Sequence, residues 1–274
     1  MTRFKTFDGL TLAYSDVGEG LPVLCLAGLT RNGSDFDYVA PYLNGARVIR
    51  LDYRGRGASG WADPATYTVP TEARDVVALL DYLELDKVAV LGTSRGGLIA
   101  MMLAATVKDR LLGVCLNDIG PVVDPTGLDV IRGYVGKSPS VKTYEEAALA
   151  KARLMTGFVG VPASRWLEEA RKQLVETDHG LKINYDPDLA KVFEFTEDNP
   201  APTDFWPVFE ALKGLPLALI RGANSDLLTA ETAAEMQARC PEMIFAEVPD
   251  RAHVPFLDEP EAVAAIRSWL GQMQ

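Results

Sequence analysis

A serine flanked by glycines stands where a predicted buried strand meets a predicted helix. The apolar, β-branched run 88–91 is followed by Gly-Thr-Ser-Arg-Gly, and helical periodicity begins at residue 95. Small residues two positions before and after the serine let such a sharp turn form without a backbone collision. The turn presents a hydroxyl at a helix N-terminus, where the helix dipole favours developing negative charge. The pattern predicts that Ser94 is a nucleophile; the alternative is a serine that only caps the helix.

A serine nucleophile needs a general base, and the chain contains only two histidines. His253 follows the apolar run 243–248 and precedes a C-terminal helical stretch. It is therefore predicted on a loop at a strand end, where the catalytic side chains of open α/β sheets gather. His179 lies in a polar turn. His253 is the predicted base, and His179 is predicted to be solvated.

The base in turn needs a carboxylate that fixes its tautomer and stabilises the imidazolium. Asp226, in the turn-rich loop after the apolar run 216–220, is the predicted acid. Asp118 also follows an apolar run and remains the alternative. The alternative role for Asp226 is to stabilise a turn or to cap the N-terminus of a helix. The predicted chemistry is attack of Ser94 on a carbonyl carbon.

The elements that position these residues follow from the hydrophobic pattern. Unbroken apolar runs alternate with amphipathic stretches, as in a parallel sheet covered by helices on both faces. The predicted strands are 23–27, 48–51, 88–91 and 111–116, and the predicted helices are 34–43, 71–85 and 95–108. The fold class is therefore α/β.

The alternation stops between residues 122 and 214, a segment rich in helix formers and prolines. It is too long for a plain loop and predicts an inserted helical lid. The alternation resumes at residue 215 and ends with a predicted helix over 259–271. The predicted organisation is a core domain of residues 1–121 and 215–274, with a lid of residues 122–214.

Three features together resemble a known family. They are the turn around Ser94, the segment Asp-Tyr-Arg-Gly-Arg-Gly-Ala-Ser at 52–59, and the spacing of Asp226 and His253 to the C-terminus. Over nearly its whole length the chain resembles lid-bearing α/β-hydrolase-fold proteins, a group that includes carboxylesterases, lactonases and C–C bond hydrolases. In this family the triad follows the chain order serine, acid, histidine.

The resemblance implies a mostly parallel eight-stranded sheet and an oxyanion hole made of backbone amides. The N–H groups of Arg95 and Leu29 would hold the developing oxyanion. Ala27 stands where the family commonly has a histidine before the glycine, but the Gly28-Leu29 turn is retained. The Arg95 side chain is predicted to fold away from the pocket and pair with an acid such as Asp118 or Asp52; a substrate carboxylate is the other candidate partner.

Bulk composition narrows the function classes. A net charge of −11 disfavours nucleic acid and anionic membranes as partners. The chain has three cysteines, and Cys25 and Cys115 lie inside apolar runs, which predicts no disulfide framework and a cytoplasmic location. No zinc-type ligand spacing, no apolar leader core and no run of membrane-spanning length is present in the sequence.

The sequence thus predicts a serine hydrolase that cleaves a carboxylic ester of a small to medium, largely apolar substrate through an acyl-enzyme, without cofactor or metal. Phe205, Trp206 and Arg31 are predicted substrate contacts, against the alternatives of packing within the lid and of a surface loop. The same triad would serve a lactonase, a C–C bond hydrolase of a vinylogous diketone, or an acyltransferase or perhydrolase. A ligand receptor with little turnover is the distant alternative. The sequence leaves open a homo-oligomer.

Overall fold

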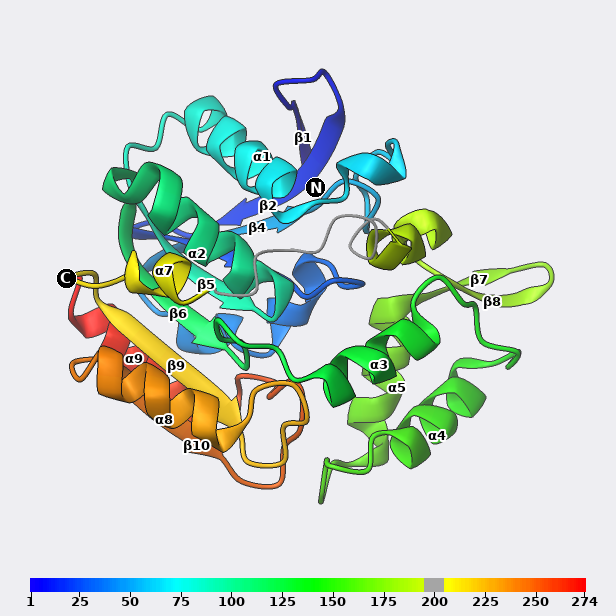
Figure 1. Ribbon diagram of the computed structural model, residues 1–274. Coiled ribbons are helices and arrows are strands. Elements are labelled where there is room, and N and C mark those ends of the chain that lie inside the picture. Colours follow the sequence, from blue (N-terminus) through cyan, green and yellow to red (C-terminus); the bar gives the residue numbers. More distant parts are fainter. Residues whose placement is uncertain (195–204) are drawn as a thin grey trace.

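The centre of the molecule is a twisted sheet, shown in a computed structural model that describes residues 1–194 and 205–274 (Figure 1). Within these residues the sheet has eight strands in the order β1-β2-β4-β3-β5-β6-β9-β10. Their bounds are β1 (Thr2–Lys5), β2 (Thr11–Val17), β3 (Leu21–Leu26), β4 (Ala46–Asp52), β5 (Val88–Thr93), β6 (Leu111–Asn117), β9 (Leu217–Gly222) and β10 (Ile244–Val248). β2 pairs antiparallel with β1 and β4, and the other pairings are parallel. The expected mostly parallel eight-stranded sheet is confirmed.

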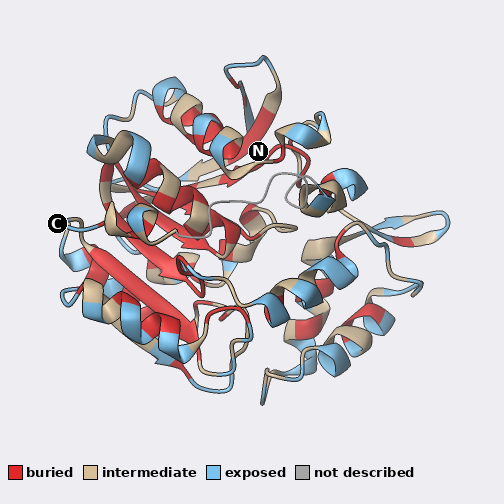
Figure 2. Cartoon of the chain, viewed as in Figure 1, coloured by how far each residue is buried: buried red, intermediate tan, exposed pale blue. Residues whose placement is uncertain are grey.

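Helices cover both faces of this sheet. The first face packs against α1 (Val69–Tyr82), α2 (Arg95–Val107) and α8 (Ala230–Arg239), and the second against α9 (Pro260–Gly271). Successive residues of one strand enter opposite cores: in β5, Val90 joins the first and Leu91 the second. This is why the central strand β5 is an apolar run and is buried along its length, as are most residues of the sheet's centre in Figure 2.

Short 3-10 helices complete the core. They are η1 (Gly33–Asp37), η2 (Ala40–Tyr42), η3 (Pro64–Thr66), η4 (Lys108–Arg110) and η5 (Pro187–Lys191). The predicted helix over 34–43 is therefore wrong in type, since η1 and η2 replace it. Pro41 lacks the N–H that a continuous α-helix would need there.

The chain between β6 and β9, hereafter the insertion (residues 122–214), is rich in helices over its described residues 122–194 and 205–214. It contains α3 (Pro125–Tyr134), α4 (Tyr144–Leu154), α5 (Ala163–Gln173) and α7 (Trp206–Glu210), together with an antiparallel hairpin of β7 (Leu174–Thr177) and β8 (Gly180–Ile183). α4, α5 and the hairpin share a small core around Trp166. In contrast, α7 places Phe209 in the core beside α2. The division of the chain at residues 122 and 214 stays a prediction.

The structure also locates the two cysteines of the apolar runs and bears on membrane-spanning segments. Cys25 and Cys115 are buried in β3 and β6, and burial raises the pKa of the Cys25 thiol to about 12. No helix in the described ranges is long and apolar enough to cross a membrane.

Candidate active site

Ser94 sits at the tip of the turn between β5 and α2, with a backbone φ of +50°. A non-glycine residue in this region is strained, and such strain is tolerated where the surroundings enforce it. A Cβ on Gly96 would collide with the Leu26 carbonyl of β3, and one on Gly92 would lie 2.6 Å from the Gly96 carbonyl carbon. The two glycines let helix and sheet approach closely enough to lift Ser94 above the sheet edge.

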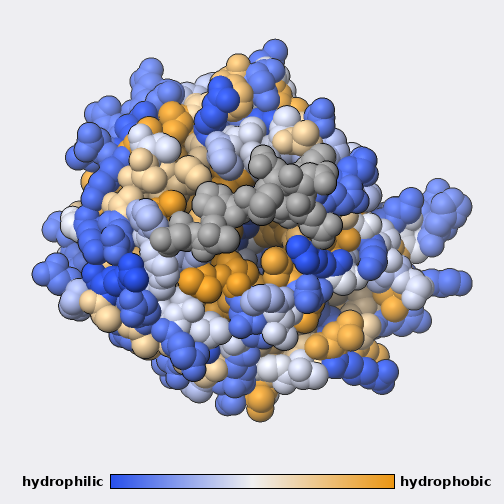
Figure 3. Space-filling model, in the orientation of Figure 1, coloured by the Kyte–Doolittle hydropathy of each residue, from blue (hydrophilic) through white to orange (hydrophobic). Residues whose placement is uncertain are grey.

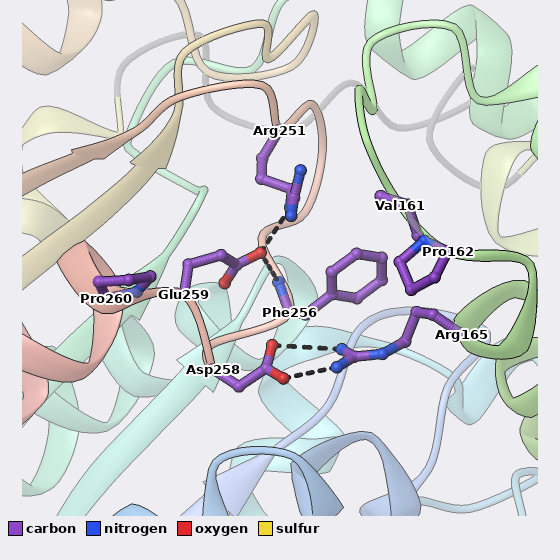
Figure 4. Close-up of a pocket in the computed structure, with 8 residues that line it drawn as sticks. All are labelled: Val161, Pro162, Arg165, Arg251, Phe256, Asp258, Glu259 and Pro260. Atoms are coloured by element: carbon purple, nitrogen blue, oxygen red, sulfur yellow. Dashed lines mark hydrogen bonds and ion pairs between the residues drawn. The ribbon is translucent and has the colours of Figure 1, made fainter.

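His253 reaches Ser94 from the loop after β10. Its Nε2 lies 2.9 Å from Ser94 Oγ, and both side chains are half-buried. The loop that carries His253 is tied to the insertion on one flank of a surface notch of about 230 Å³ (Figure 4). There Arg165 of α5 forms an ion pair with Asp258, and Glu259 accepts from Arg251 Nε at 2.7 Å and from Phe256 N–H at 3.1 Å.

The acid that meets His253 is Asp118, directly after β6. Its Oδ2 lies 2.8 Å from His253 Nδ1, and the carboxylate is fully buried. It also accepts from the Gly222 N–H at 2.8 Å and from the Ser225 hydroxyl at 2.6 Å. Three donors therefore surround a carboxylate that burial would otherwise penalise.

The prediction that Asp226 is the acid partner of His253 is wrong. Asp226 is exposed in the loop between β9 and α8, while its neighbour Ser225 turns inward to Asp118. β6 and β9 are adjacent parallel strands that end at the same edge of the sheet. A carboxylate after either strand is thus a candidate, and the sequence alternative Asp118 is the one that the fold brings to the histidine.

The three side chains form a directed hydrogen-bond chain. A carboxylate can only accept, so His253 donates from Nδ1 and leaves its Nε2 lone pair for the Ser94 hydroxyl. This tautomer is the one that can take the serine proton as the hydroxyl oxygen attacks. The arrangement is chemically competent for nucleophilic attack on an electrophilic carbon.

The turn that carries Leu29 lies against the nucleophile, since a Cβ on Gly28 would lie 3.9 Å from Ser94 Cβ. Its carbonyls are bound elsewhere: Ala27 O accepts from Tyr53 Oη, Gly28 O from the Arg31 N–H, and Leu29 O from Arg56 Nε. In the described part of the chain, no hydrogen bond to a protein acceptor occupies the N–H of Leu29 or of Arg95. That these two amides bind an oxyanion stays a prediction.

The Arg95 side chain folds away from the site, as predicted, but its partner is neither Asp118 nor Asp52. Arg95 Nε donates to Glu72 Oε2 of α1 at 2.6 Å. The sequence reasoning missed Glu72. A usable signal was present, because Glu72 lies four residues before Val76, on the apolar face of its helix.

The predicted substrate contacts have other neighbours in the structure. Arg31 bonds to Asp35 and to Glu169 of α5, each at 2.7 Å. Trp206 packs edge-on against Phe209 and under the Arg239 guanidinium of α8. Phe205 immediately precedes α7. Contact of these residues with a substrate stays a prediction.

Metal-ligating side chains do not cluster in the described ranges: no three of His, Cys, Asp or Glu stand where they could share an ion.

The fold and this site agree with the comparison with known proteins. A model of the alpha/beta hydrolase family matches residues 23–266. The chain is a member of the alpha/beta hydrolase family. This family membership confirms the fold expected from the resemblance, and the names of the relatives support a hydrolase.

The chain is similar to two curated relatives and to one solved structure. It is 39% identical to a 3-hydroxybutyrate-oligomer hydrolase of Cupriavidus necator over 251 residues, which cover 88% of this chain and 85% of that protein. It is 23% identical to a 2-(acetamidomethylene)succinate hydrolase of Mesorhizobium japonicum, covering 89% and 85%. A crystal structure of an alpha/beta hydrolase from Novosphingobium aromaticivorans superposes with a TM-score of 0.92 at 38% identity, covering 99% and 97%.

Proposed function

We propose that this family member is a serine hydrolase of carboxylic esters. The observation that carries the proposal is the continuous hydrogen-bond chain from Ser94 Oγ through His253 to the buried Asp118 carboxylate. This chain supplies a nucleophile, a general base and an orienting acid in one site. Asp118 replaces Asp226 in that third role.

Acylation begins when Ser94 Oγ attacks the ester carbonyl carbon and His253 Nε2 takes the hydroxyl proton. The carbonyl oxygen becomes negative, and the N–H groups of Leu29 and Arg95 hold it. Removing one such donor typically slows an enzyme by a factor of about 10²–10³. The tetrahedral intermediate then collapses, and His253 returns the proton to the leaving alcohol.

Deacylation repeats these steps with water as the nucleophile. His253 removes a proton from water, the hydroxide attacks the acyl carbon, and the proton passes to Ser94 Oγ as the acid leaves. Asp118 stabilises the imidazolium in both halves of the cycle. The enzyme ends in its starting state and releases one alcohol and one carboxylic acid.

For the substrate we propose a short oligoester of a hydroxy acid, with the insertion as a lid over the site. The 39% identical relative is named for hydrolysis of 3-hydroxybutyrate oligomers, and the identity extends over 88% of this chain. Hydrophobic side chains also gather where the insertion meets the core (Figure 3). An apolar surface there suits a largely apolar oligoester.

The test is hydrolysis of 3-hydroxybutyrate dimers and trimers, beside p-nitrophenyl butyrate, by the wild type and Ser94→Ala. The expected result is Ser94-dependent turnover of all three, with the oligomers preferred, and fluorophosphonate labelling of Ser94. Hydrolysis that persists in Ser94→Ala would refute the mechanism. Turnover of the aryl ester without turnover of the oligomers would refute the substrate and leave the mechanism standing.

A further inference from the structure

A fully buried carboxylate lies between two arginines beneath the nucleophile turn. Glu72 is 0% exposed, Arg56 is 0% exposed and Arg95 is 8% exposed. Glu72 Oε1 lies 2.9 Å from Arg56 Nη1, and Glu72 Oε2 lies 2.6 Å from Arg95 Nε. The proposed triad uses none of these three side chains, although burying three charges together is costly without a compensating role.

Each arginine is attached to one of the two amides assigned to the oxyanion. Arg95 carries one of these N–H groups itself, and its Nη2 also donates to Tyr67 O at 2.7 Å. Arg56 Nε donates to Leu29 O at 2.9 Å, which restrains the residue that carries the other N–H. Arg56 Nη1 also donates to Arg54 O at 2.6 Å. The Glu72 carboxylate forms an ion pair with each of the two guanidinium groups.

Charge keeps this arrangement in place. Two guanidinium groups held together away from water repel each other, and the Glu72 carboxylate between them makes the pair tolerable. Burial lowers the pKa of Arg56, and the Arg95 charge adds to that effect while the Glu72 charge opposes it. Without the carboxylate the two arginines would separate and would carry their attached backbone with them.

We propose that Glu72 is a positioning residue that sets the spacing of the Leu29 and Arg95 N–H groups across the oxyanion hole. The inference rests on the proposed function, because it concerns the two amides assigned to the oxyanion. Glu72 lies on α1, which begins at the Thr68 N-cap and packs in the core. Because both arginines contact Glu72, this one helix fixes the positions of both amides. Positioning of this kind affects the transition state more than the bound ester, whose carbonyl oxygen carries little charge.

The test uses Glu72→Gln with Asp75→Asn as its matched control. Asp75 lies three residues further along α1 and is equally buried, but its partner Arg54 contacts neither amide. We expect Glu72→Gln to lower kcat by about 10- to 100-fold while KM changes by less than about threefold. Affinity for a trifluoromethyl ketone, whose adduct carries an oxyanion, should fall by the same factor as kcat/KM. A folded Asp75→Asn variant should match the wild type in kcat, in KM and in affinity for the trifluoromethyl ketone.

A second pair of variants separates positioning from folding. Arg56→Lys keeps a charge beside Glu72 but lacks the guanidinium Nε that bonds Leu29 O, and it should show the same kcat loss. The double variant Glu72→Gln/Arg56→Met keeps the net charge of the cluster at its wild-type value. It removes the hydrogen bond from Arg56 to Leu29 O and the ion pairs of Glu72. We expect it to fold more stably than Glu72→Gln and to remain as slow. Recovery of kcat in the double variant would show that only charge balance matters and would overturn the proposal.

The rate at which a fluorophosphonate labels Ser94 distinguishes this inference from the proposed function. If the wild type is labelled and Glu72→Gln is labelled equally fast, the positioning role is refuted and the serine hydrolase stands. If Ser94 of the wild type is not labelled, both proposals fall together. Slower labelling of Glu72→Gln and Arg56→Lys, with unchanged labelling of Asp75→Asn, is the supporting result.

Discussion

The ends of two adjacent strands each offer an aspartate, and the structure treats them differently. Asp118 follows β6 directly, is fully buried and accepts three hydrogen bonds. Asp226 lies four residues beyond β9 and is exposed. Both strands end at the same edge of the sheet, within range of the loop after β10. The difference shows that a carboxylate becomes part of a site through the donors around it, not through its place in chain order.

The loop after β9 serves the site by supplying those donors. The Gly222 N–H and the Ser225 hydroxyl both bind Asp118, so this loop stabilises the acid of the adjacent strand. A buried carboxylate without such donors would be strongly destabilising. Substitution of a residue that tertiary contacts hold in place should therefore have a larger effect than the same substitution of an exposed neighbour or of an exposed residue of the same type.

The largest contrast concerns the two histidines. His253→Ala removes the base and should lower kcat by a factor on the order of 10⁶. His179→Ala, in the exposed turn between β7 and β8, should leave kcat within about twofold of the wild type. Steady-state ester hydrolysis by both purified variants measures this. A large loss in His179→Ala would contradict the assignment of the base.

The two aspartates should differ almost as strongly. Asp118→Asn should lower kcat by a factor on the order of 10⁴, because the amide no longer fixes the tautomer or stabilises the imidazolium. Asp226→Asn should change kcat by less than about threefold. Near-UV circular dichroism of both variants controls for folding. The reverse order of effects would restore Asp226 as the acid.

Adjacent glutamates in α5 extend the comparison to stability. Burial raises the pKa of Glu169, but the charges of Arg31 and Lys151 outweigh it and lower that pKa from 4.5 to about 2. Glu169 therefore stabilises the fold above pH 4.5, and this contribution is lost as the pH falls towards 2. Glu169→Gln should lower the free energy of unfolding in urea at pH 7, and the difference from wild type should shrink below pH 4.5.

The control for this prediction is the exposed neighbour, Glu168. Glu168→Gln should change the free energy of unfolding at pH 7 by no more than about 0.5 kcal/mol. Equal losses in the two variants, or a Glu169→Gln loss that persists at pH 2, would show that the Arg31 bridge to the insertion does not carry this stability.

The smallest effect is expected when Asp118 loses one hydrogen-bond donor, the Ser225 hydroxyl of the loop after β9. Ser225→Ala deletes one of three hydrogen bonds to the carboxylate and should lower kcat by about 3- to 10-fold. The adjacent Asp226→Ala serves as its control and should be unchanged. A loss in Ser225→Ala as large as that of Asp118→Asn would mean that Ser225 takes a direct part in proton transfer.

Local pattern was sufficient for much of this protein. The run 88–91 followed by two spaced glycines predicted the turn at Ser94, because only small residues let the helix approach the sheet there. Alternation of apolar runs with amphipathic helices predicted the parallel sheet. The pattern failed at 34–43, where a proline divides the helix, and it did not find the hairpin β7–β8, which is too short and too exposed to show a clear period.

The sequence by itself determined the sheet, the nucleophile turn and the histidine that reaches it, since these follow from local sterics, hydrophobic period and the scarcity of histidine. Tertiary structure alone decided which aspartate meets His253 and what holds the Leu29 turn. Asp118 follows β6, whereas its donors Gly222 and Ser225 lie at the end of β9. Glu72 likewise meets Arg56 and Arg95 across three segments. No period or spacing along the chain encodes such meetings, because they depend on how neighbouring strands and helices pack in space.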